Sequence, residues 1–178
     1  PDESSASFTV LPIHNYIITQ NLQATFIISS VSGVVWKGTS LTYSLTIINE
    51  DHEALVNFAE SEGTLNENNS GGVVIEIPFS AQAPGEGSIT ISFTPVNTAY
   101  GNNFTTIPAA AANNIVTLNV AANQSSVSFK VLPVNNVECS SVERYIQWKI
   151  SFANGSLIKG SELDYKLTLV DDEQVSLI

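Results

Sequence analysis

The chain has 178 residues, of which 43% are hydrophobic, and its formal net charge is −11. The hydrophobic fraction is sufficient for a folded core, whereas the acidic balance argues against nucleic acid phosphates and anionic membrane surfaces as partners. Cys139 is the single cysteine, which excludes an intrachain disulfide, and no apolar run is long enough to span a bilayer. Divalent cations remain compatible with this composition.

The N-terminal third of the chain repeats a later part. Residues 4–12 (SSASFTVLP) return as residues 125–133 (SSVSFKVLP), and residues 37–46 (KGTSLTYSLT) return as residues 159–168 (KGSELDYKLT). The offsets are 121 and 122 residues, respectively. A repeat of this length is a whole domain rather than a solenoid unit.

This repeat predicts one and a half domains. We expect residues 1–52 to be the C-terminal half of one domain, with three strands, and residues 53–178 to be a complete second copy. On this interpretation the chain opens inside a domain, so the absence of a signal peptide has no bearing on localisation.

The predicted half domain has an apolar face that requires a cover. Its inward positions are apolar: Phe8, Val10, Phe26, Ile28, Leu41, Tyr43, Leu45 and Ile47. Burial of each such side chain is worth about 1.5–3 kcal/mol, and an open half-sandwich is an aggregation hazard. We expect the cover to be a second copy, in a homodimer through residues 1–52 by strand exchange or face-to-face packing, or a cleaved upstream segment that remains bound.

Apolar residues alternate with polar ones throughout the predicted complete domain. The clearest runs are residues 73–79, 88–94, 126–131, 146–152 and 163–169. A period of two predicts strands with one buried face, and loops rich in Gly, Pro and Asn separate them. The pattern gives about seven strands, typical of a Greek-key β-sandwich. It also places Trp148 in the core, in phase with Ile146, Ile150 and Phe152.

Four stretches resemble the motifs of one family. They are residues 56–67 (VNFAESEGTLNE), residues 97–104 (NTAYGNNF), residues 133–138 (PVNNVE) and residues 169–173 (LVDDE). In this order and spacing they resemble a Calx-beta domain, which occurs in sodium–calcium exchangers, integrin cytoplasmic tails and many bacterial surface proteins. The resemblance implies an all-β, immunoglobulin-like sandwich.

In calcium-binding members of that family, the ligands cluster at one end of the sandwich. Mapped by motif, the resemblance implies eight metal-ligand positions: Glu67, Asn103, Asn135, Asn136, Glu138, Asp171, Asp172 and Glu173. At three of them an asparagine stands where a carboxylate is typical, and calcium affinity depends on the number of ligand charges. We therefore expect weak calcium binding or none, and no other cofactor.

The half copy is no better equipped for calcium, because it has His14-Asn15 and Asn49-Glu50-Asp51 at the corresponding positions. A competing interpretation of residues 171–173 is an acidic strand end that prevents edge-to-edge pairing. Trp36 aligns with Ile158 beside a turn and is a candidate for contact with a sugar ligand.

The sequence lacks the signatures of common enzymes, among them G-x-S-x-G, H-E-x-x-H and a glycine-rich phosphate loop. We therefore expect a non-enzymatic structural, spacer or adhesion module of a larger bacterial cell-surface or secreted protein. Its expected partners are neighbouring Calx-beta-like domains. The alternative is a calcium-binding module that rigidifies an interdomain junction, and a third class, carbohydrate recognition, would need exposed aromatic residues.

Overall fold

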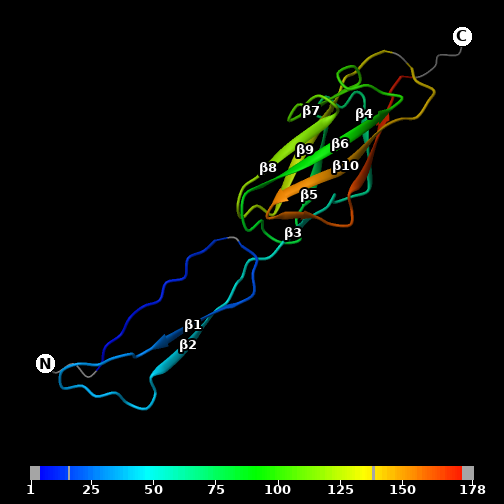
Figure 1. Ribbon diagram of the computed structural model, residues 1–178. Coiled ribbons are helices and arrows are strands. Elements are labelled where there is room, and N and C mark those ends of the chain that lie inside the picture. Colours follow the sequence, from blue (N-terminus) through cyan, green and yellow to red (C-terminus); the bar gives the residue numbers. More distant parts are fainter. Residues whose placement is uncertain (1–4, 16, 138, 174–178) are drawn as a thin grey trace, which may run out of the picture. The chain divides into compact units, whose positions relative to one another are not determined.

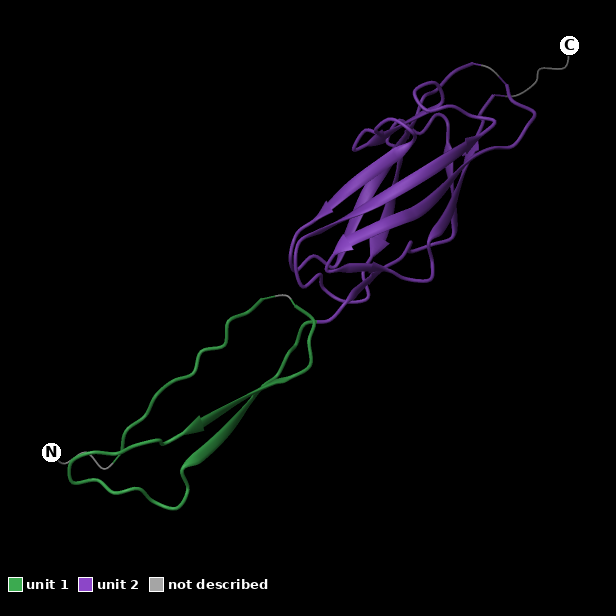
Figure 2. Cartoon of the chain, viewed as in Figure 1, with its two compact units in different colours: residues 1–51 green, residues 52–178 purple. Residues whose placement is uncertain are grey.

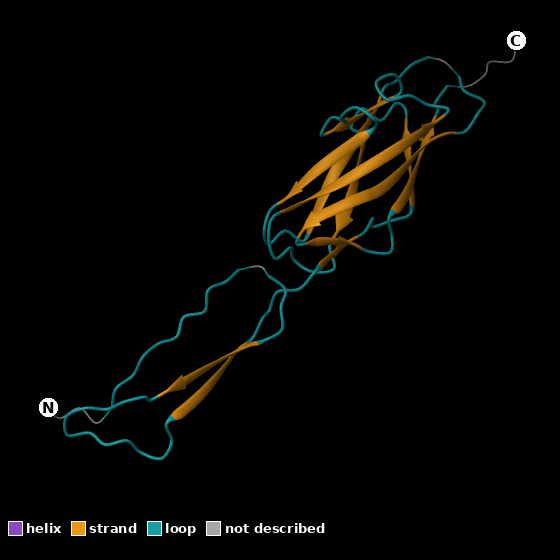
Figure 3. Cartoon of the chain, viewed as in Figure 1, coloured by secondary structure: helices purple, strands orange, loops and turns teal. Residues whose placement is uncertain are grey.

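The structure is a computed structural model that describes residues 5–15, 17–137 and 139–173. The chain divides into two compact units, residues 1–51 (unit 1) and residues 52–178 (unit 2) (Figure 2). The described residues form strands, turns and loops (Figure 3). No helix among them is long and apolar enough to cross a membrane.

Unit 2 is a β-sandwich, as predicted (Figure 1). Its larger sheet has the order β4 (Glu62–Asn66), β12 (Asp164–Val170), β10 (Arg144–Gly155), β6 (Gly87–Val96) and β8 (Ile115–Val120). The second sheet has the order β5 (Val73–Pro78), β9 (Ser126–Pro133) and β7 (Phe104–Ile107). A short parallel pair, β3 (Ala54–Val56) and β11 (Leu157–Lys159), completes the unit.

The described part of unit 2 therefore has ten strands rather than about seven. The additional strands β4, β7 and β11 have only five, four and three residues. So few residues show too little alternation to distinguish a strand from a loop. The residues of β4 lie in the motif stretch 56–67, for which the alternation predicted no separate strand.

Trp148 packs between the two sheets, as predicted, and its side chain is fully buried. The indole centroid lies 4.6 Å from the ring of Phe93 in β6 and 4.8 Å from that of Phe129 in β9, which belongs to the other sheet. Trp148 thus joins the two layers of the core.

The inward position predicted for Phe152 is wrong, since this side chain is 55% exposed. The pairing of β10 with β6 shifts register between Ile150 and Phe152. An extra residue in one strand reverses the alternation beyond it, so the inward phase of Ile146, Trp148 and Ile150 ends there.

Unit 1 contains two strands among its described residues, β1 (Leu22–Ile27) and β2 (Thr42–Ile47), rather than the three expected. Residues 5–12, the counterpart of β9, form no strand. In unit 2, β9 pairs with β5 and β7, and the described residues of unit 1 contain no counterpart of either strand to supply the ladder hydrogen bonds. The contact between layers is nevertheless present, because the rings of Phe8 and Phe26 lie 5.2 Å apart at the positions of Phe129 and Trp148.

The registers of the two units are identical. Phe26 pairs with Tyr43 in unit 1 as Trp148 pairs with Tyr165 in unit 2. Each residue of one pair is 122 positions from its counterpart in the other. The internal repeat is therefore a structural repeat in which β1 and β2 correspond to β10 and β12.

Substitution Trp148→Ala should destabilise unit 2 by about 3–5 kcal/mol, because it leaves a cavity between the sheets. Chemical denaturation followed by circular dichroism measures this change. Trp36→Ala is the matched control: Trp36 is 90% exposed, and its loss should change the unfolding free energy very little. A cost below about 1 kcal/mol for Trp148→Ala would contradict the inward register.

Candidate functional site

The acidic residues at one end of unit 2 are brought together by a parallel strand pair. β4 and β12 run side by side in the same direction, with Leu65 opposite Leu169 and Asn66 opposite Val170. The backbone N–H of Glu67 donates to the carbonyl of Val170 at 2.8 Å, so the residues after both strands meet. Carboxylate oxygens of Glu67, Asp171 and Glu173 lie within 4.8 Å of one another.

A guanidinium group lies among these carboxylates. Arg144 begins β10, which is antiparallel to β12, and its Nη2 is 2.6 Å from Oε2 of Glu67 and 3.4 Å from Oδ2 of Asp171. The side chains of Arg144, Glu67 and Asp171 are 8%, 5% and 13% exposed, respectively. The chain's own cation therefore neutralises the buried carboxylate of Glu67, which would otherwise carry a large desolvation penalty.

The sequence prediction did not include Arg144. A signal was present, because this residue is the only arginine of the chain and is in phase with the inward Ile146 and Trp148. An arginine at an inward strand position requires a buried counter-ion.

The oxygens of Glu67 and Asp171 all accept hydrogen bonds from this chain. Oε1 of Glu67 accepts from the backbone N–H of Asn136 at 3.0 Å and from the side-chain amide of Asn136, while Oε2 accepts from Arg144. Oδ2 of Asp171 accepts from the backbone N–H of Ser140, and Oδ1 accepts from the backbone N–H of Glu173 at 3.0 Å. A bound cation would have to displace these donors.

Asp171 and Glu173 form a carboxyl pair. A hydrogen bond with Glu173, together with the backbone N–H groups of Ser140 and Glu173, lowers the pKa of Asp171. The same hydrogen bond with Asp171, followed by burial, raises the pKa of Glu173. Glu173 is therefore the partner that takes up a proton first as the pH falls.

The other predicted ligand positions lie elsewhere or serve local structure. The side-chain oxygen of Asn103 accepts from the backbone N–H of Ala99 at 2.9 Å and stabilises its own turn. Asp172 is exposed and accepts from the amide of Asn68 at 3.0 Å. Asn135 is exposed, and Glu138 lies outside the described residues. From the predicted set, the structure thus assembles Glu67, Asn136, Asp171 and Glu173, and Asn103 lines a small hollow with Glu67 and Arg144.

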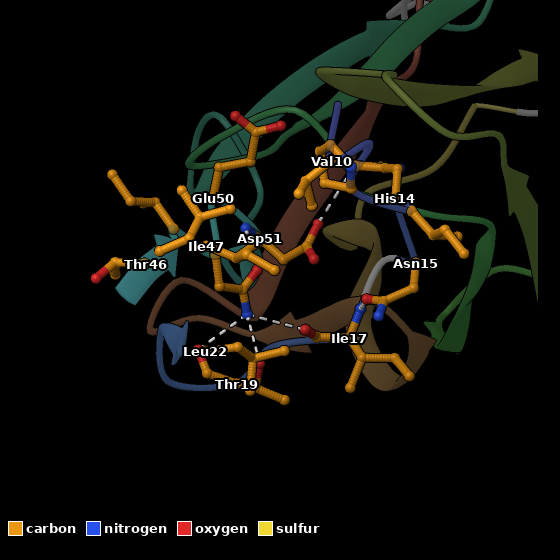
Figure 4. Close-up of a pocket in the computed structure, with 15 residues that line it drawn as sticks. Val10, His14, Asn15, Ile17, Thr19, Leu22, Thr46, Ile47, Glu50 and Asp51 are labelled. Atoms are coloured by element: carbon orange, nitrogen blue, oxygen red, sulfur yellow. Dashed lines mark hydrogen bonds and ion pairs between the residues drawn. The ribbon is translucent and has the colours of Figure 1, made fainter. Parts of the chain in front are cut away.

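The corresponding end of unit 1 contains a hollow of about 550 Å³ (Figure 4). Its apolar lining includes Leu22 and Ile47, and its polar rim includes His14, whose Nε2 lies 3.7 Å from Oδ1 of Asp51. The amide of Asn49 donates to the backbone carbonyls of Ile17 and Thr19 at 3.0 and 2.9 Å.

No family model and no curated protein matches the sequence. Among solved structures, the apo-form Calx CBD1 domain aligns with 68% of this chain and 100% of its own, with a TM-score of 0.55 and 9% identity. The calcium binding domain CBD12 of CALX1.1 aligns with a TM-score of 0.56 and 9% identity, over 68% of this chain and 47% of its own. CBD12 from CALX1.2 aligns with a TM-score of 0.55 and 9% identity, over 66% of this chain and 45% of its own. The chain therefore contains a Calx-beta-like fold, and it spans less than half of the two CBD12 structures.

A double-mutant cycle tests whether Arg144 and Glu67 stabilise each other. Arg144→Leu leaves the carboxylate of Glu67 buried without its cation, which should cost about 3–5 kcal/mol. Glu67→Leu leaves the guanidinium with Asp171 alone, at 3.4 Å, and should cost less. The double variant should be more stable than either single variant, because neither charge remains. Urea denaturation measures all four proteins.

The matched control is the exposed pair Lys149 and Asp164, whose side chains are 57% and 59% exposed. Substitution Lys149→Met should change stability by no more than about 1 kcal/mol. Additive effects of the two substitutions at Arg144 and Glu67 would show that the ion pair contributes no coupling energy.

Glu173→Gln tests the carboxyl pair through its pH dependence. Because the raised pKa of Glu173 disfavours its charged form in the folded state, the neutral amide should make the variant more stable than the wild type at pH 7. The difference should shrink as the pH falls through the raised pKa, where folded wild-type Glu173 takes up a proton, and should vanish below the ordinary pKa of a glutamate, where the unfolded state is protonated as well. Melting temperatures between pH 7 and pH 3 measure this, with Glu86→Gln at an exposed position as the control.

Proposed function

We propose that unit 2 is a non-enzymatic structural module. At the end that contains the predicted metal-ligand positions, an internal ion pair holds the strands together instead of a bound metal ion. The observation that carries the proposal is the position of Arg144. Its guanidinium binds Glu67 and Asp171, two of the carboxylates at the predicted ligand positions. A covalently attached cation needs no calcium in the medium, so the module stays rigid at any calcium concentration.

The state of the carboxylates supports a non-enzymatic role. A general acid–base pair requires a desolvated carboxyl group that faces a substrate. In unit 2, Glu67 is paired with Arg144, and the proton-accepting Glu173 is hydrogen-bonded to Asp171. The oxygens of Glu67 and Asp171 accept hydrogen bonds from the chain itself, as expected of a structural site, whereas Oε2 of Glu173 is buried without a hydrogen-bond partner among the described residues.

We further propose that the module belongs to a series of similar domains in a bacterial cell-surface or secreted protein, with a spacer or adhesion role. The tandem repeat supports a series, because β1 and β2 reproduce the register of β10 and β12 in the same chain. The composition supports an exterior location, since charged residues make up only 13% of the chain and the polar surface is supplied largely by Ser, Thr and Asn. Neighbouring domains of the same fold are the proposed partners.

The alternative proposal is a calcium-responsive module. Two observations favour it: the carboxylate oxygens of Glu67, Asp171 and Glu173 are close together, and CBD12 of CALX1.1 is a calcium binding domain of the same fold. For calcium to bind, Arg144 would have to leave the cluster.

Calcium titration separates the two proposals. Isothermal titration calorimetry of the wild-type chain should give no saturable heat below the millimolar range typical of weak extracellular sites. Arg144→Leu is the comparison variant, since loss of the guanidinium leaves Glu67 without its cation. Calcium should raise the melting temperature of this variant more than that of the wild type. A micromolar dissociation constant for the wild type would favour the calcium-responsive module.

A further inference from the structure

The apolar face of unit 1 is largely open. Tyr43 is 63% exposed and Leu22 is 57% exposed, whereas their counterparts Tyr165 and Arg144 are both 7% exposed. Every buried apolar residue in the described part of the chain belongs to unit 2. An open sheet face of this kind normally marks an interaction surface.

Unit 2 shows which structure covers an equivalent face. There, β6 pairs with the free side of β10 in antiparallel orientation, and β4 pairs with the free side of β12 in parallel orientation. The ring of Trp148 contacts Phe93 from β6 and Phe104 from β7 as well as Phe129. The described residues of unit 1 include the counterparts of β9 to β12 but none of β4 to β8, and Phe26 contacts Phe8. The surface therefore fits a polypeptide that supplies strands with the pattern of β4 to β8.

The strands β3 to β8 of this chain include such a set. Two parts of the chain could therefore pair with it: β1 and β2 of unit 1, and β10 and β12 of unit 2. Most inward residues of the two partners are alike: Ile28 and Ile150, Leu41 and Leu163, Tyr43 and Tyr165, Leu45 and Leu167, Ile47 and Leu169. Similar sequences in tandem carry a risk of mispairing between domains.

β1 differs from β10 at three successive inward positions. Leu22 stands at the position of Arg144, Ala24 at that of Ile146, and Phe26 at that of Trp148. If β4 closed on unit 1, the carboxylate of Glu67 would face Leu22 and lose its cation. The smaller Ala24 and Phe26 would also leave voids against the side chains that fit Ile146 and Trp148.

We propose that Leu22, Ala24 and Phe26 are specificity-determining residues of a docking face. They prevent unit 1 from pairing with strands β3 to β8 of its own chain or of a second copy. They reserve this face for a separate polypeptide segment with the β4 to β8 pattern, which lies outside residues 1–178. That polypeptide has an apolar residue at the position of Glu67, because Leu22 offers no charge, and larger side chains opposite Ala24 and Phe26. The proposal rests on the modular role proposed above and names the partner of that module.

The test converts the three positions in the 178-residue chain. In the variant L22R/A24I/F26W, β1 acquires the inward residues of β10, so both strand sets should compete for β3 to β8. Hydrogen exchange measured by mass spectrometry should then show two populations, one slow and one fast, in peptides that cover β1, β2, β10 and β12. In the wild type the same peptides should show slow exchange in β10 and β12 and a single fast population in β1 and β2.

Two variants serve as matched controls. Q23R/T25I/I27W introduces the same three residues on the opposite face of β1 and should leave the exchange pattern as in the wild type. A24I/F26W restores the volume without the cation, so the second population should be smaller than in the triple variant.

Two outcomes would overturn the proposal. In the first, β1 and β2 of the triple variant exchange as in the wild type, and the three residues do not determine pairing. In the second, light scattering shows a wild-type dimer whose β1 and β2 exchange as slowly as β10 and β12, and a second copy covers the face. Neither outcome bears on the calcium titration, which concerns Arg144 alone.

Discussion

At one end of unit 2, the packing of β4, β10 and β12 depends on the buried guanidinium group of Arg144. β4 is distant in sequence from β10 and β12, and Glu67, Arg144 and Asp171 lie where these three strands meet. A buried carboxylate and a buried guanidinium are each costly alone and acceptable together. The pairing therefore requires the correct register of three strands at once, because a shift of one residue would turn Arg144 to the other face of the sheet.

Much of this fold could be predicted from local patterns. Alternation in residues 146–152 placed Trp148 in the core, and the repeat of residues 37–46 predicted that unit 1 would contain strands equivalent to those of unit 2. Local patterns do not reveal a bulge, so Phe152 was assigned to the wrong face. Nor do they identify strands as short as β7 and β11, which form only when a neighbour supplies hydrogen bonds.

The candidate site was harder to predict for a related reason. Its acidic members follow strand ends and can be located by motif. Their counter-ion is 77 residues away from Glu67 in sequence, and only the arrangement of the strands brings the two together.

The role of an asparagine at a predicted ligand position also depends on the fold and not on the residue type alone. Asn49 and Asp171 occupy equivalent positions and accept the same backbone bond, from Asp51 and Glu173, respectively. Asn49 donates to a carbonyl of the preceding loop, whereas Asp171 accepts from an N–H group there. The same turn is thus stabilised in both units, by a side-chain donor in one and by a side-chain acceptor in the other. The residue type at this position therefore does not by itself identify a ligand site.

The parallel pairing of β4 with β12 has a mechanical consequence. β4 lies near the start of unit 2 and β12 near its end, and five residues of each strand are in register, from Glu62 opposite Lys166 to Asn66 opposite Val170. In a parallel pair, tension on the beginning of one strand and the end of the other acts along the strands. The ladder hydrogen bonds are then loaded in shear and must break together rather than one at a time. Resistance to such a force is set by the unfolding rate and not by the equilibrium stability. The ion pair between Arg144 and Glu67 lies at the end of this ladder, where it opposes the first sliding movement of β4 past β12.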